Sequence, residues 1–144
     1  MTLAPRTFNP MQGYAAGEAL QTVRDFGANG LRSTFARCIQ EGQDGNFDII
    51  ELEQGAAALT IVAVAHGAAV VGADTVRAAL DRATLDRVRD DTPLDEVRAT
   101  RDVLGHEIKA GLLEYLGTDP EVAAGYRRTM ATLSDTIDTM GVPA

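Results

Sequence analysis

The hydrophobic and polar positions of this chain follow the period of an α-helix in most segments, but one segment is apolar on every side. From Phe47 to Gly72 it reads FDIIELEQGAAALTIVAVAHGAAVVG, with no charged side chain between Glu53 and Asp74. Its apolar residues cover the whole circumference of a helix, and such a helix must be enclosed by the rest of the protein. The pattern predicts a central buried helix over residues 48–71.

The start of this helix carries a capping pattern. With Asp48 as the N-cap residue, Glu51 falls at N3 and the two acids form a capping box. Phe47 and Leu52 then take the positions of a hydrophobic staple. We therefore expect the chain to enter the central helix at a defined angle, with Gly67 and Gly72 as candidate ends.

Two other interpretations of this region remain open. The uncharged run from Gly55 to Ala73 approaches the length of a membrane span, but its many Ala and Gly residues contribute little transfer energy. A calcium-binding loop of the EF-hand type would begin at Gln40 and place Glu51 at its twelfth position. Its first and third positions, Gln40 and Gly42, lack the carboxylates that such a loop needs.

Amphipathic helices are predicted before the central one. Asn9 followed by Pro10 resembles the start of a first helix that ends at Gly27. Its apolar positions are Ala16, Ala19, Leu20, Val23 and Phe26. A second helix is expected from about Asn29 to Gly42, with an apolar stripe of Leu31, Phe35, Cys38 and Ile39.

The segment from Asp74 to Asp91 is rich in charge. An Arg precedes an Asp by four residues at 77 and 81, 82 and 86, and 87 and 91. This is the spacing of ion pairs on the surface of a helix. Thr84 is a candidate cap within it. The pattern leaves open whether this segment is one bent helix or two short ones.

Two more helices are predicted beyond it. Thr92 before Pro93 is expected to begin a long helix that Gly117 ends, with an apolar stripe of Val97, Leu104, Ile108, Leu112 and Tyr115. Asp119 before Pro120 begins the last helix, which aligns Val122, Tyr126, Met130, Leu133, Ile137 and Met140. No run alternates strictly enough to predict a strand, so the fold class is all α: an irregular bundle of five or six helices around the central apolar helix, in a single domain over residues 1–144.

Composition narrows the possible partners. The formal net charge is −8 and Lys109 is the sole lysine, which argues against nucleic-acid binding because that role needs a basic surface. A partner is expected to be a protein, and no membrane association is predicted. The first residues, MTLAPRTF, lack the apolar core of a signal peptide, so a cytoplasmic location is expected.

Parts of the chain resemble a family of small bacterial proteins that carry domain of unknown function 4259. The resemblance runs from Phe8 to Gly67, with EQGAAALTIVAVAHG in place of an Ala-rich buried helix, and GTDPEVAAGYRRTMATL is similar to the family's last helix. The chain departs from the family pattern because it has no Trp and lacks paired acids after Asn9. The resemblance implies no catalytic residues.

Few residues suggest chemistry. His66 in the apolar helix is predicted to be a core histidine, and His106 a surface residue, because HEIKA lacks the second His of a zinc-binding HExxH helix. Cys38 lies on an apolar stripe and resembles a small buried hydrophobe. The acidic residues Asp90, Asp91, Asp95 and Glu96 are interpreted as solvated helix starts. No catalytic, cofactor-binding or metal-binding residue and no cofactor is assigned.

Two functions follow as hypotheses. The first is a non-catalytic interaction module, of a regulatory or immunity type, whose acidic surface would favour a basic partner. The alternative is a small enzyme or ligand-binding protein that uses His66 or His106 with carboxylates brought near by folding. Convergence of both histidines and a carboxylate in one cleft would favour the alternative.

Overall fold

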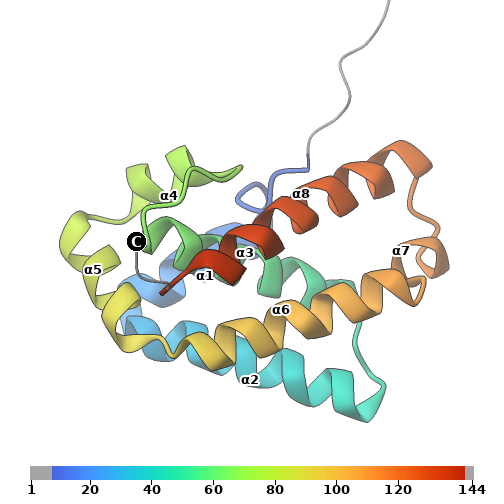
Figure 1. The fold of residues 1–144 in the computed structure, drawn as a ribbon, viewed down its shortest axis with the longest axis horizontal. Coiled ribbons are helices and arrows are strands. Elements are labelled where there is room, and N and C mark those ends of the chain that lie inside the picture. Colours follow the sequence, from blue (N-terminus) through green and yellow to red (C-terminus); the bar gives the residue numbers. More distant parts are fainter. Residues whose placement is uncertain (1–7, 142–144) are drawn as a thin grey trace, which may run out of the picture.

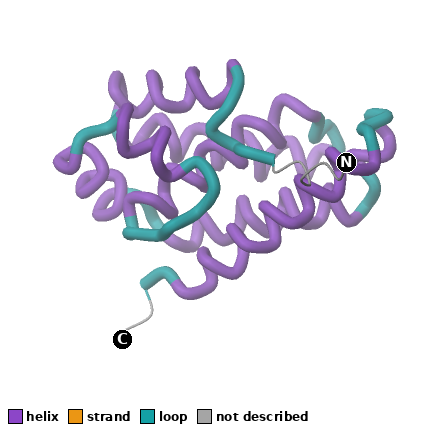
Figure 2. The backbone as a smooth tube through the Cα atoms, turned by 90° about the horizontal axis from the view of Figure 1, so that it is seen from above, coloured by secondary structure: helices purple, strands orange, loops and turns teal. Residues whose placement is uncertain are grey.

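The computed structural model describes residues 8–141, and this part of the chain is built from helices joined by short loops, without a strand (Figures 1 and 2). The predicted all-α fold class is confirmed. The helices are α1 (Tyr14–Phe26), α2 (Ala28–Asp44), α3 (Ile49–Ala65), α4 (Ala73–Ala79), α5 (Arg82–Asp91), α6 (Leu94–Lys109), α7 (Leu112–Tyr115) and α8 (Pro120–Thr139). The absence of a signal peptide was predicted from the first residues of the chain. Of these, residues 1–7 lie outside the described residues.

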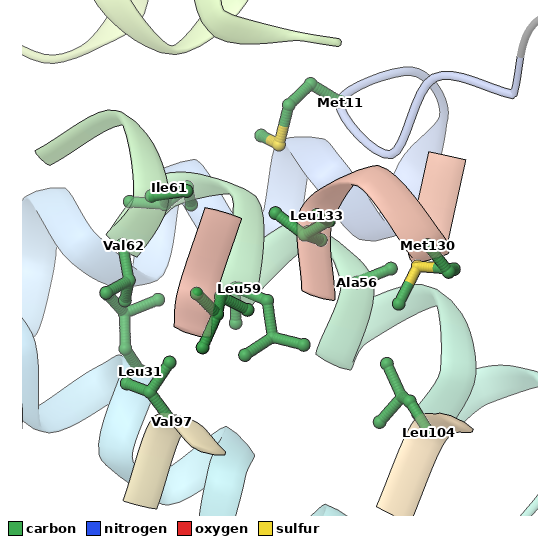
Figure 3. Packing of buried hydrophobic residues seen from close by; sticks show 14 of the residues in the cluster. Met11, Leu31, Ala56, Leu59, Ile61, Val62, Val97, Leu104, Met130 and Leu133 are labelled. Atoms are coloured by element: carbon green, nitrogen blue, oxygen red, sulfur yellow. The ribbon is translucent and has the colours of Figure 1, made fainter. Parts of the chain in front are cut away.

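Helix α3 lies at the centre of the bundle, where α1, α2, α4, α5, α6 and α8 all contact it (Figure 1). Every residue from Gly55 to Ala65 is buried. Leu59 and Val62 pack among side chains of the surrounding helices, including Leu31 of α2 and Val97 of α6 (Figure 3). A helix that is apolar all round is thus enclosed on every side, as its sequence predicts.

The predicted start of α3 is also confirmed. Asp48 Oδ1 accepts a hydrogen bond from the Ile49 amide at 2.7 Å, and the Asp48 amide donates to Glu51 Oε2 at 3.1 Å. The Asp48 side chain also accepts from the Glu51 amide, and this bond together with the one to Glu51 Oε2 forms the capping box. Phe47 and Leu52 are both buried in the core cluster, as the hydrophobic staple requires.

Helix α3 ends at Ala65 and does not continue to residue 71. Gly67 has a φ of +87°, and its amide donates to the carbonyl of Val64 at 2.9 Å. The next amide, of Ala68, donates to the carbonyl of Ala63 at 3.0 Å. This pair of bonds is a Schellman motif, which terminates a helix through a left-handed glycine.

Gly27 ends α1 and α2 begins at Ala28, close to the predicted Asn29, but the other two predicted boundaries of the first two helices are wrong. Asn9 does not begin α1: its Oδ1 accepts from the Met11 amide at 2.9 Å within a separate turn, and the helix starts at Tyr14. Phe26, placed on the apolar stripe, is 69% exposed. Helix α2 passes through Gly42, where a side chain would meet Val103 of α6, and ends at Asp44.

Residues 74–91 form two helices, because Leu80 adopts an extended conformation between them. The cap of α5 is Asp81, whose Oδ1 accepts from the Thr84 amide at 2.8 Å, so Thr84 is not the cap. Instead of the predicted pairs at a spacing of four, Arg89 contacts Asp86 at 3.5 Å and Asp90 at 3.0 Å.

The long helix predicted after Thr92 is interrupted. Helix α6 begins at Leu94 after Pro93, without a side-chain cap from Thr92. Gly111, with a φ of +103°, separates it from α7, and the turn leaves Tyr115 87% exposed although it was expected on the buried stripe. The last helix follows its prediction: Asp119 accepts from the Glu121 amide at 2.9 Å, and the stripe from Tyr126 to Met140 is buried.

Within residues 8–141, no helix is both long enough and apolar enough to cross a membrane.

Candidate functional site

The C-terminal end of α3 opens into a pocket of about 490 Å³ beneath the two short helices α4 and α5. These helices lie together at one end of the bundle (Figure 1). The pocket is lined by Val64, Ala65, His66, Gly67, Arg77, Leu80, Asp81, Arg82, Leu85, Asp86 and Arg89. Its volume is in the range of sites for small ligands.

Local structure explains why charged residues meet here. The Schellman motif at Gly67 ends α3 and leaves His66 at the margin of the core. Leu80 and Val88 are buried in the core cluster, so they anchor α4 and α5 beside the end of α3. The guanidinium of Arg77 donates to the carbonyl of Ala68 at 3.3 Å, which ties α4 to the segment that leaves α3.

The pocket carries more positive than negative charge, in contrast to the acidic protein. Arginines 77, 82 and 89 outnumber aspartates 81 and 86 among the lining residues. Arg89 is engaged by Asp86 and Asp90, and Arg77 by a carbonyl. Arg82 is exposed and has no hydrogen-bond or ion-pair partner among residues 8–141. It is the guanidinium at this pocket with its donors open to a ligand.

His66 is the C-cap residue of α3 and is half-buried, so the prediction of a core histidine is wrong. Its Nε2 atom is buried without a hydrogen-bond partner within the described chain. Burial lowers the pKa of His66 below 6.5, Arg89 lowers it further, and Asp90 partly opposes this. A buried polar atom without a hydrogen-bond partner is uncommon in folded proteins.

A lowered histidine pKa makes stability depend on pH. The unfolded chain takes up the proton first, so the free energy of unfolding should fall as the pH drops below about 6.5 and continue to fall until the folded pKa is reached. We expect His66→Leu to remove this part of the acid sensitivity in urea denaturation between pH 8 and pH 5. The exposed His106→Leu is the matched control and should keep the wild-type slope. An unchanged slope in His66→Leu would contradict the assignment.

The structure places the other candidate residues apart from this pocket. His106 is exposed on α6 and is not a lining residue, so the two histidines do not converge. Cys38 is buried, with its Sγ 3.5 Å from the carbonyl oxygen of Glu51, and burial raises the pKa of its thiol to about 12. A thiol with this pKa is not a nucleophile at neutral pH.

The acidic residues before and within α6 are divided between different partners. Asp90 pairs with Arg89, and Glu96 pairs with Arg32 of α2 at 2.9 Å. Across residues 8–141, no group of three or more His, Cys, Asp or Glu side chains is arranged to hold a metal ion. The calcium-loop interpretation is wrong as well, because residues 40–44 belong to α2 and Gln40 donates to Asp44 at 3.0 Å.

The arginines of this pocket were not predicted as site residues, because Arg77 and Arg82 were assigned to surface ion pairs and Arg89 was given no role. A usable signal was present in α5, where Arg82, Asp86 and Arg89 recur at i, i+4 and i+7 and therefore share one face. Leu85 lies on the same side and gives that face an apolar component. A charged face that also carries a leucine is typical of a helix bordering a cleft.

In comparisons with protein-family models, with curated proteins and with solved structures, this chain matches none. The resemblance to proteins with domain of unknown function 4259 therefore stays a hypothesis.

Proposed function

We propose that this protein is a non-catalytic interaction module and that the His66 pocket receives an anionic group, a carboxylate or a phosphate, of its partner. The observation that carries the proposal is the set of three arginines that line one pocket with His66, at one end of an otherwise acidic protein. Arginine offers a planar fork of donors that fits carboxylate and phosphate oxygens.

The residues that line the pocket suit different parts of such a ligand. Val64, Leu80 and Leu85 supply apolar surface, and Arg82 supplies donors that no described residue engages. An acidic side chain on an apolar stem, or a phosphorylated one, would meet both. A protonated His66 would add a further donor, so an anion should bind more tightly as the pH falls.

The alternative of a small enzyme receives less support. His66 shares the pocket with Asp81 and Asp86, but His106 does not line it, so the convergence of both histidines that this alternative needs is incomplete. A general base is also oriented by a hydrogen bond to a second group, and in the described part of the chain the His66 ring has no hydrogen bond to Asp81 or Asp86. The geometry therefore favours binding over catalysis.

Titration with inorganic phosphate, followed by NMR of the backbone amides, tests the proposal. We expect saturable shifts in residues 64–67 and 80–89, and an affinity about tenfold lower in Arg82→Gln, since a charge-assisted hydrogen bond is worth roughly 1.5–3 kcal/mol. Arg87→Gln is the matched control. Arg87 lies on the same helix and carries the same charge but does not line the pocket.

The pattern of losses decides the outcome. Less than a twofold change in Arg87→Gln, beside the tenfold loss in Arg82→Gln, supports a specific anion site. Equal losses in the two variants would reduce the effect to general charge attraction and would refute the proposal.

A further inference from the structure

A second pocket, of about 340 Å³, lies near the N-terminal end of α3, whereas the His66 pocket lies at its C-terminal end. The turn that precedes α1, the start of α1, and one residue each of α3 and α8 form its walls. The residues that give it chemical character are Phe8, Tyr14, Glu53 and Tyr126. None of them belongs to the anion site proposed above.

Aromatic rings dominate this pocket. Phe8 stacks on Tyr126 with ring centroids 3.6 Å apart and an interplanar angle of 17°. The hydroxyl of Thr129 donates to the carbonyl of Phe8 at 2.9 Å, which holds the N-terminal segment against α8. Tyr14 is 84% exposed at the other wall. Three of the seven Phe and Tyr residues of the chain are thus gathered around one opening.

The charge of this pocket is negative. Among the described residues that line it, Glu53 is the one charged side chain, and no described residue forms an ion pair with its carboxylate. Burial raises the pKa of the Tyr126 phenol and the charge of Glu53 raises it further, so the ring stays neutral. The pKa of Tyr14 is also raised, by a hydrogen bond with Glu18. Neutral rings beside a carboxylate that has no ion-pair partner among residues 8–141 create an attractive field for a cation.

We propose that this pocket binds an alkylated ammonium group through the rings of Phe8 and Tyr14 and the carboxylate of Glu53, with the buried Tyr126 ring stacked against Phe8. A weakly hydrated organic cation gains from aromatic faces as well as from a carboxylate. A small metal ion would need several oxygen ligands in place of rings. Pro10, from the turn before α1, adds further apolar surface for the alkyl groups.

The test uses choline as the probe and 3,3-dimethylbutan-1-ol, its neutral isostere, as the comparison. We expect choline to shift the amides of Tyr14, Glu53 and Tyr126 in a saturable way, with at least tenfold higher affinity than the isostere. Glu53→Gln and Tyr14→Ala should each weaken choline binding about fivefold or more. Asp135→Asn, which removes one exposed carboxylate of α8 outside the pocket, should leave it unchanged.

Three results would overturn the proposal. The first is equal binding of choline and the isostere, which would indicate a purely apolar pocket. The second is an equal loss in Glu53→Gln and Asp135→Asn, which would indicate attraction to the net charge. The third is the absence of choline shifts at these amides in a protein whose spectrum is that of the folded chain.

Discussion

Ala58→Asp is expected to lower the free energy of unfolding by about 3–5 kcal/mol, because it places an unpaired carboxylate inside the core. Ala58 is fully buried in the middle of α3, and so are Ala56 and Ala57 beside it. Successive helix positions point about 100° apart, so these three residues face different neighbours. The same substitution at each of the three sites should be damaging, whereas an amphipathic helix would tolerate it on one side.

Ala36→Asp is the matched control for this prediction. Ala36 is exposed in the middle of α2, so the change removes helix propensity without burying a charge. It should cost less than about 1 kcal/mol. Urea denaturation at pH 7 measures both variants, and a loss at Ala58 as small as that at Ala36 would show that α3 has a solvated side.

Phe35→Ala should lower the free energy of unfolding by about 3–5 kcal/mol. Phe35 lies on α2, is fully buried, and is the largest of the fully buried side chains in the described core. Its removal takes apolar surface out of the contact between α2 and the rest of the core and leaves a cavity that the surrounding helices can fill only in part.

Phe26→Ala offers a direct comparison, because both phenylalanines lie on predicted apolar stripes. Phe26 is 69% exposed, so truncating it should change stability by no more than about 0.5 kcal/mol. Chemical denaturation of the two variants side by side tests the difference. A comparable loss in both would place Phe26 in the core and contradict the structure.

Phe26 also shows what the sequence could not predict. The features that depend on near neighbours were predictable: Asp48 and Glu51 form their capping box, and Asp119 caps α8. Phe26 and Tyr115 fit helical stripes equally well by spacing, yet each lies at the end of its helix and is exposed. Periodicity identifies the face of a helix, but it cannot show where along that face the neighbouring helix stops.

The same distinction applies to the candidate site. His66 was visible in the sequence as an isolated titratable residue in an apolar run, and the lowering of its pKa was predictable from burial. Its exposure at a pocket was not, because the sequence offers both Gly67 and Gly72 as ends of α3 and does not show which of them is used. Arg77, Arg82 and Arg89 reach the same pocket only because the chain turns at Leu80 and folds α4 and α5 over the end of α3.

The most direct test of the proposed anion site is an NMR pH titration of the His66 imidazole with and without inorganic phosphate. We expect the pKa of His66 to lie below 6.5 in the free protein. In saturating phosphate the pKa of His66 should be higher, since an anion at the pocket stabilises the charged ring. In Arg82→Gln, the phosphate concentration needed for this change should rise about tenfold. A His66 pKa that is the same at every phosphate concentration would contradict the assignment of this pocket as the binding site.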